Sequence, residues 1–173
     1  MDYNYGDTGP GGGTIFANEQ RYGEGKNYMV FYEAAPASYE FRAAWGPTDR
    51  WIRITRSFYY DGRKATEEIK NQSGSTNYAA KRSYELLCNG KTDWYMPAQW
   101  EMNEMFNILI RGGFMKNKET YAFQNDIYWC TGEAGERDPS IAYVVSMVNG
   151  RFSSFCKTSQ FWVRPVRSFA VFD

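Results

Sequence analysis

The last third of the chain constrains the fold most, because its apolar residues occur in short runs typical of strands. Four runs follow Gly113, at 127–131, 142–148, 151–156 and 161–169. The Asn149-Gly150 pair between the second and third runs favours a type I′ turn, whose two central residues both need a positive φ angle. This part of the chain is therefore predicted to form a twisted antiparallel sheet.

Helical spacing dominates the middle of the sequence. A short helix is predicted over 64–71, and a second from Asn77 to Gly90, with an apolar face of Ala80, Tyr84, Leu87 and Cys88. A third begins near Pro97, which suits a first helical turn, and ends at Gly112-Gly113. Its apolar stripe consists of Met102, Met105, Phe106 and Leu109.

The N-terminal part combines a glycine-rich segment with two apolar runs. Residues 6–13 are predicted to be a flexible turn that enters a strand at 14–17, and 28–35 forms a further strand ended by Pro36. The glycines do not form a phosphate loop, because Thr-Ile-Phe follows Gly13 where that loop needs Lys-Ser or Lys-Thr. Residues 37–63 show no clear period and are predicted to be a long loop.

These elements predict an α+β fold, with two or three helices packed on a twisted antiparallel sheet. The 173 residues show no internal repeat and no linker, so residues 1–173 are predicted to form one domain. Aromatic residues make up 18% of the chain, a proportion that suits both packed β-cores and recognition surfaces. Packing in the core is expected to account for most of them.

Charge and hydropathy narrow the choice of partners. The 20 basic and 20 acidic residues balance, and Lys and Arg form no cluster of four or more, so neither nucleic acid nor an anionic membrane is an expected partner. No stretch of about 18 apolar residues and no signal peptide is found, so membrane insertion is not expected.

Catalytic and metal chemistry are disfavoured by residue types. The chain lacks histidine, which is the commonest general base near neutral pH and the commonest transition-metal ligand. Cys88, Cys130 and Cys156 lie 42 and 26 residues apart, which matches neither a zinc site nor a redox motif. We therefore expect a non-enzymatic protein with no cofactor and no bound transition metal.

Residues 151–156, with the sequence Arg-Phe-Ser-Ser-Phe-Cys, suggest programmed diversification. Each of these residue types can be encoded by a codon that ends in a pyrimidine, which is what an AAC or AAT codon becomes when both adenines are randomised. The run lies between Gly150 and a segment that contains Lys157, Arg164 and Arg167. Six such residues also occur together by chance, so the surrounding motifs have to support the hypothesis.

Five motifs occur in order along nearly the whole chain. They are Gly6-Asp7-x-Gly9-Pro10-Gly11-Gly12-Gly13, Glu33-Ala34-Ala35-Pro36, Asp93-Trp94-Tyr95-Met96-Pro97 with Glu101, Tyr128-Trp129, and Val163-Arg164-Pro165-Val166-Arg167-Ser168-Phe169. Together they resemble the C-terminal domain family of the collagen-like bacterial adhesins. The resemblance implies a C-type-lectin-like fold of the formylglycine-generating-enzyme branch. Proteins of this architecture include adhesin tips and the variable proteins of diversity-generating retroelements.

The sequence departs from the family pattern at several positions. Ala98 replaces the serine that caps a helix in the family, so a neighbouring group is expected to cap it. Cys130, Thr131 and Gly132 replace three residues that are often serine in the family, and all three can be encoded by pyrimidine-ending codons. The paired cysteines that hold copper in the oxidases of this fold have no counterpart here.

The resemblance implies a binding module that displays a diversified surface on a phage particle or a bacterial cell surface. Its partner would be a protein or glycan on a target cell, and a homo-oligomer is possible. Three alternatives remain open: an invariant adhesin tip that binds host glycan or protein, a divergent enzyme, and a structural cap that trimerises a fibre. The residues expected to face the ligand are Cys130, Thr131, Val144, Ser146, Arg151, Ser153, Ser154, Phe155, Cys156, Thr158, Ser159 and Phe161.

A second group of residues is expected to be structural. Arg164 and Arg167 lie among apolar residues of the last run, where an inward arginine needs carboxylate or carbonyl partners, so buried ion pairs are favoured over an anion site. The resemblance implies Glu33 and Glu101 as partners. Asp93 and Trp94 are expected to form a buried anchor before the third helix.

Overall fold

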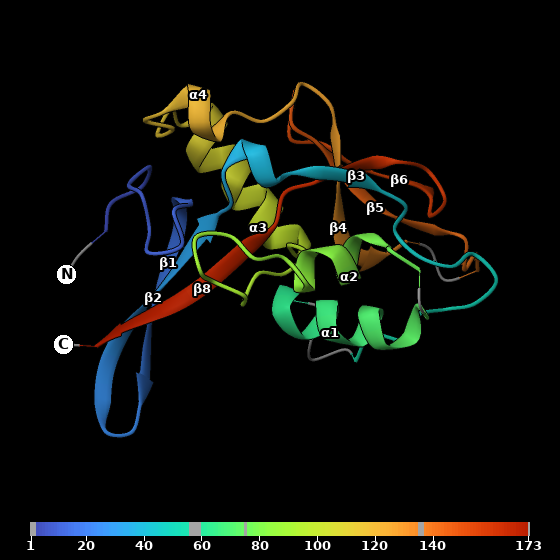
Figure 1. Ribbon diagram of the computed structural model, residues 1–173, viewed down its shortest axis with the longest axis horizontal. Coiled ribbons are helices and arrows are strands. Elements are labelled where there is room, and N and C mark those ends of the chain that lie inside the picture. The colour runs from blue at the N-terminus through green and yellow to red at the C-terminus, as the bar shows by residue number, and fades with distance from the viewer. Residues whose placement is uncertain (1–2, 56–59, 75, 135–136, 173) are drawn as a thin grey trace.

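A computed structural model of the chain describes residues 3–55, 60–74, 76–134 and 137–172. These residues form eight strands in two sheets and four α-helices, which confirms the predicted α+β class. One sheet has the strand order β1-β2-β8 and the other the order β3-β7-β4-β5-β6. In Figure 1 the two sheets lie at opposite ends of the molecule, with helix α3 between them.

The first sheet is built on a long hairpin. Strands β1 (Thr14–Gly23) and β2 (Lys26–Ala34) pair antiparallel, and β8 (Val166–Phe172) pairs antiparallel with β2. Glu24 and Gly25 connect β1 to β2 with φ angles of 53° and 77°, the sign that a two-residue hairpin turn requires. Both strands are longer than predicted, because their outer ends are polar and show no apolar alternation.

The second sheet contains most of the predicted C-terminal strands. It comprises β3 (Phe41–Ala43), β4 (Ile127–Glu133), β5 (Ile141–Ser146), β6 (Phe152–Cys156) and β7 (Phe161–Val163). All neighbouring pairs are antiparallel except β4 and β7, which meet in parallel at Tyr128 and Trp162. β3 lies within the segment predicted to be loop; residues 56–59 of that segment lie outside the described residues.

The single strand predicted over 161–169 is wrong. The chain leaves the second sheet after β7 and enters the first at β8, with Arg164 and Pro165 between them. Pro165 has no N–H group to contribute to a ladder, so the pairing is interrupted there.

The type I′ turn predicted at Asn149-Gly150 is found instead at the other Asn-Gly pair, Asn89-Gly90. The β5–β6 hairpin is confirmed, but only Gly150 of its turn has a positive φ, of 72°, and Ser146 N–H reaches the Arg151 carbonyl across residues 147–150. At Asn89-Gly90 both φ angles are positive, at 49° and 71°. Cys88 and Lys91 exchange two main-chain hydrogen bonds around this second pair, so the type I′ geometry occurs there.

The second helix was predicted to continue to Gly90, which is too far, because a turn at Asn89-Gly90 follows it. Helix α2 (Ala79–Tyr84) ends before the Asn89-Gly90 turn. Tyr84 and Leu87, expected on its apolar face, are 41% and 63% exposed. Cys88 is buried as expected, although it lies in the turn and not on the helix.

The other helices agree better with the sequence. Helix α1 (Gly62–Gln72) covers the predicted 64–71, and the short α4 (Lys118–Tyr121) was not predicted. The third predicted helix is α3 (Gln99–Glu104), which continues as a π-helix, η3 (Met105–Arg111). Met102, Met105 and Leu109 are buried and Phe106 is partly buried, which confirms the apolar stripe.

Two clusters of buried side chains pack on opposite faces of the second sheet. Tyr128, Cys130 and Val145 belong to a cluster shared with the first sheet, α3 and η3. Trp129, Ala142 and Val144 belong to a cluster shared with α1, α2 and the segment after β3. Trp45, Trp94 and Trp129 are the largest fully buried side chains, so core packing accounts for much of the aromatic content. Among the described residues, no helix combines the length and apolar character needed to span a bilayer.

Candidate functional site

Arg164 is a buried structural residue, as predicted, but its partner is not the one expected. Its guanidinium donates to one oxygen of Glu40 at 3.0 and 2.6 Å. It also donates to the main-chain carbonyls of Ala35, Tyr121 and Ala122. These acceptors satisfy the guanidinium inside the protein, so Arg164 is not available to an anionic ligand.

Arg167 forms a second buried network, in which the expected partner Glu33 is confirmed. Arg167 donates to Glu33 at 2.5 Å and binds both oxygens of Asp93 at 2.7 and 2.9 Å. The amides of Gly11 and Gly13 donate to the two oxygens of Glu33, each at 2.9 Å. The glycine-rich segment therefore wraps a buried carboxylate, which explains its glycines: a Cβ atom at Gly11 would lie 2.8 Å from a Glu33 oxygen. Trp94 is buried as expected, whereas Asp93, expected to be buried with it, is only half-buried.

Glu101 is structural, but it does not pair with an arginine. One of its oxygens accepts the N–H of Ala98, the N-cap residue of α3, at 2.6 Å, which is one half of a capping box. Ala98 has no side-chain oxygen, so the bond that the serine would accept is not replaced. The other accepts the Tyr95 hydroxyl at 2.7 Å. Burial raises the pKa of Glu101 to about 8, because the charged carboxylate would lose its hydration, and the hydrogen bonds from Ala98 and Tyr95 and the charge of Arg63 offset this loss only in part.

Strand β6 holds four of the twelve residues expected to face a ligand: Ser153, Ser154, Phe155 and Cys156. All of its residues, 152–156, are exposed, as is Arg151 before it. Because side chains alternate along a strand, Ser153 and Phe155 share a face with their partners Val144 and Ala142 on β5. Ser154 and Cys156 point to the other face. The structure therefore divides the predicted run between the two faces of the sheet.

The face that carries Phe155 contains a series of ring contacts. The Phe155 ring meets Phe161 edge-to-face at 5.0 Å, and Phe161 in turn contacts Trp129 at 5.0 Å. Ser146 and Arg151 extend the β5–β6 register on this face. We call Ser146, Arg151, Ser153, Phe155 and Phe161 the aromatic face; it sets one cation and two rings beside two small hydroxyl residues.

The turn after β6 lies next to this surface. Thr158 is exposed and Ser159 is half-buried. The Thr158 hydroxyl lies 3.2 Å from the Cys156 sulfur, and hydrogen bonding to Thr158 lowers the pKa of that thiol. Cys156 is therefore an exposed cysteine with more thiolate character than an isolated thiol.

Three residues expected to face a ligand are buried instead. Cys130, Thr131 and Val144 are at most 1% exposed, so none of them can contact a ligand in the folded protein. Burial raises the pKa of Cys130 to about 12. The Thr131 amide donates to the Pro97 carbonyl at 3.0 Å. Cys130 and Thr131 differ from the family pattern, but these departures lie in the core.

The sequence analysis also missed exposed apolar residues near β6. Phe152 is 38% exposed, and alternation along β6 places it on the face of Ser154 and Cys156. Val148, in the turn between β5 and β6, is 62% exposed. Phe152 lies within the run 151–156 that has the codon pattern, but it was not among the residues expected to face the ligand. Alternation along the strand, which places it beside Ser154 and Cys156, was the signal that could have added it to that set.

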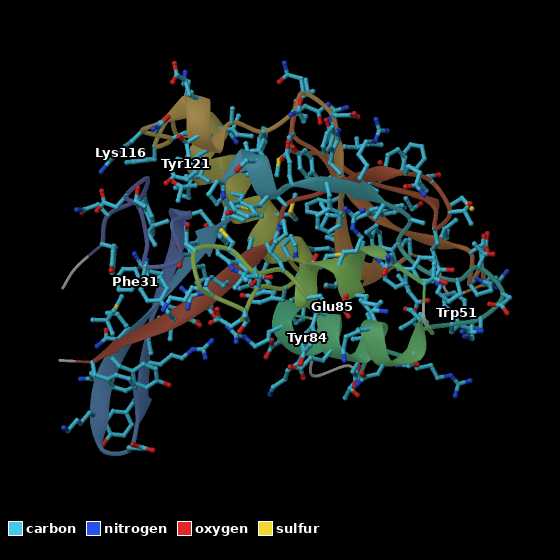
Figure 2. All side chains as sticks on the ribbon, in the orientation of Figure 1. Phe31, Trp51, Tyr84, Glu85, Lys116 and Tyr121 are labelled. Carbon is cyan, nitrogen blue, oxygen red and sulfur yellow. The ribbon has the colours of Figure 1, made fainter. Side chains whose placement is uncertain are left out.

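A buried lysine anchors the end of β6. Lys157 is fully buried, its ammonium group contacts Glu133 at 2.5 Å, and it lies 4.8 Å from the centre of the Trp45 ring. Its amide and carbonyl bond to Ser140 and Trp45, each at 2.7 Å. Trp51, 6.0 Å from the same ammonium group, lies at the end of the molecule opposite Phe31 of the first sheet (Figure 2).

A pocket of about 570 Å³ lies away from this surface. It is lined by residues of β1, β2, β8 and the starts of α1 and α3, among them Tyr32, Arg63, Tyr95, Trp100 and Glu101. Arg63 lies 5.2 Å from the centre of the Tyr95 ring and donates to the Ser168 carbonyl at 3.1 Å. No residue of β6 lines this pocket. Within the described ranges, no three His, Cys, Asp or Glu residues are grouped so as to hold a metal ion.

Comparisons with known proteins do not identify a family. No protein-family model matches the chain, and no curated protein matches it.

Proposed function

We propose that this chain is a non-enzymatic binding module with a C-type-lectin-like fold, and that β6 and the following turn form its recognition surface. The observation that carries the proposal is the contrast along 151–167. Every residue of β6 is exposed, whereas Lys157, Arg164 and Arg167 are buried and paired. Side chains on β6 can therefore change with little effect on the core, which is what a diversified surface requires.

The composition of the surface supports recognition of another molecule. Aromatic and arginine side chains supply most of the binding energy at typical protein interfaces, and small polar residues shape the contact around them. The aromatic face has this arrangement, with Arg151, Phe155 and Phe161 beside Ser146 and Ser153. We infer that the partner is a protein or glycan on a target cell.

The codon pattern of 151–156 and the order of the five motifs favour a variable protein of a diversity-generating retroelement, carried on a phage particle or a bacterial cell surface. An invariant adhesin tip is the alternative. The neighbouring DNA separates the two: a near-identical repeat that differs only at adenines, beside a reverse transcriptase gene, is expected for the variable protein. Its absence would favour the adhesin.

Randomisation tests the surface directly. We expect variants randomised together at the exposed or half-buried positions Arg151, Ser153, Ser154, Phe155, Thr158 and Ser159 to stay folded, because exposed substitutions usually change stability by no more than about 0.5 kcal/mol each. Binding to the native target should be lost, with Arg151→Ala and Phe155→Ala each weakening it by about 2 kcal/mol. Widespread unfolding, or binding preserved across the folded variants, would contradict the proposal.

A further inference from the structure

The outer edge of β6 presents main-chain groups most of which have no hydrogen-bond partner among the described residues. The Arg151 carbonyl and the Lys157 amide bond toward β5, at 2.9 and 2.7 Å. Because hydrogen-bonding direction alternates along an antiparallel strand, the amide and carbonyl groups of Phe152, Ser154 and Cys156 point away from β5. Of these, the Cys156 carbonyl accepts the Ser159 amide at 2.9 Å. Among the described residues, nothing outside the β5–β6 ladder bonds to the others.

The edge of the first sheet at β1 is protected. The N-terminal segment covers the start of β1, where Gly6 N–H donates to the Ile15 carbonyl at 2.8 Å and Ile15 N–H donates to the Asp7 carbonyl at 2.9 Å. The rest of that strand carries the charged Glu19 and Arg21. Charged residues and covering segments are two common ways in which proteins block pairing at a sheet edge.

The remaining two edges are protected as well. Tyr95 and Val166 exchange two main-chain hydrogen bonds at the edge formed by β8, at 2.8 and 2.9 Å. At β3, which is only 3 residues long, the Arg82 guanidinium donates to the Arg42 carbonyl at 2.8 Å. Among the described residues, the outer edge of β6 is covered only at the Cys156 carbonyl. The strand contains no charge and no proline, and its register with β5 is regular.

We propose that the free edge of β6 receives an extended segment of a partner polypeptide as an added antiparallel strand. This inference rests on the proposed function and narrows the partner to a protein. Unpaired amides and carbonyls at strand spacing recognise another main chain, and antiparallel pairing is the more stable geometry. Main-chain bonds do not depend on side-chain identity, so the edge would supply affinity that persists while the side chains of β6 vary. Those side chains would then select the partner sequence.

The side chains around the edge indicate which segments fit. Ser153 and Ser154 leave room for larger residues opposite them, since cross-strand neighbours lie about 5 Å apart. Arg151 is exposed at the start of β6, and an antiparallel partner places its C-terminal end there. A suitable segment therefore has β-branched or aromatic residues in its middle and an acidic residue at its C-terminal end.

Replacement of Ser154 by proline tests the free edge separately from the β5–β6 pairing. The Ser154 N–H points away from β5, so Ser154→Pro removes a donor from the free edge and blocks the approach of a strand, while the β5–β6 ladder can remain. Ser154→Ala is the matched control, because it removes the side chain and keeps the amide. The probe is a library of short displayed peptides, enriched on the intact wild-type chain in the presence of excess soluble Ser154→Pro protein.

We expect the enriched peptides to have alternating β-branched residues and an acidic C-terminal end. They should bind Ser154→Pro about tenfold more weakly, or worse, than Ser154→Ala, because both variants lack the serine side chain and only Ser154→Ala keeps the amide. Hydrogen exchange provides a second readout that needs no variant. The Ser154 amide should exchange fast in the free protein and slowly with peptide bound, whereas the Ser153 amide should be slow in both states.

Three results would overturn the proposal: no enriched peptide, equal binding to Ser154→Pro and Ser154→Ala, or no slowing of Ser154 exchange by a bound peptide. Slow Ser154 exchange without peptide, together with concentration-dependent dimers, would show that a second copy of the chain occupies the edge, and would also overturn it. If Ser154→Pro keeps native-target binding while Phe155→Ala loses it, the recognition surface stands and the edge proposal fails.

Discussion

The buried ammonium group of Lys157 contacts the Glu133 carboxylate at 2.5 Å, immediately after a strand whose residues are all exposed. The pair therefore lies at the boundary between the surface that we propose to vary and the core that supports it. Glu133 also accepts the Ile52 amide at 2.9 Å, so the pair connects β4 and the segment after β3 to the end of β6.

Lys157→Ala should lower the free energy of unfolding by about 3–5 kcal/mol, because it leaves the Glu133 carboxylate partly buried without its cation. Chemical denaturation measures the change. The adjacent Thr158→Ala is the control, expected to change stability by no more than about 0.5 kcal/mol. Equal effects of the two substitutions would show that Lys157 does not anchor β6.

Arg167→Ala should destabilise the protein by about 3–5 kcal/mol, since it leaves Glu33 buried without a cation and breaks the contact with Asp93. Arg50→Ala, which removes an exposed ion pair with Asp49, should cost no more than about 1 kcal/mol. Thermal unfolding of both variants compares the two sites. An unchanged midpoint for Arg167→Ala would favour a ligand-binding role for this arginine.

The raised pKa of Glu101 predicts a pH dependence of stability. In the folded protein the carboxyl keeps its proton up to about pH 8, whereas the unfolded chain loses it near 4.5. Between these values the folded state binds more protons, so the contribution of Glu101 to stability falls as pH rises, by about 1.4 kcal/mol per pH unit. Glu101→Gln carries no such proton. Between pH 4.5 and 8 the unfolding free energy of Glu101→Gln should therefore increase relative to that of the wild type. A difference that stays constant over this range would show that the pKa of Glu101 is not raised.

The three cysteines should differ in reactivity toward a thiol reagent. Cys156 is exposed and its pKa is lowered by hydrogen bonding to Thr158, so it should label rapidly in the native protein. Cys88 and Cys130 are buried, and burial raises the pKa of each, so they should label only on unfolding. Thr158→Ala should slow the labelling of Cys156. Rapid native labelling of Cys130 would show that β4 opens in solution.

Several features of the fold were predictable because they depend on neighbouring residues. The apolar stripe of Met102, Met105 and Leu109 follows from helical spacing alone. The pairing of Glu33 with Arg167, by contrast, spans 134 residues and was expected only from the resemblance of the motifs, not from local spacing. Replacement of a serine cap by Ala98 predicted a substitute cap, but Glu101 supplies only the reciprocal bond, to the Ala98 N–H.

Other features depended on contacts between residues far apart in the sequence. Glu40 pairs with Arg164 across 124 residues, and no local pattern indicates that pairing. The exposed residues of β6 are similar in type to three buried residues, Cys130, Thr131 and Val144. Those three lie on central strands of the second sheet, where the two core clusters cover both faces. Strand β6 lies at the edge of the same sheet, beyond the two clusters. Residue types and spacing indicated most of the segments that form strands and helices, although not β3 or α4. Strand order and packing decided which of those residues meet solvent, because burial depends on what other parts of the chain place on each face.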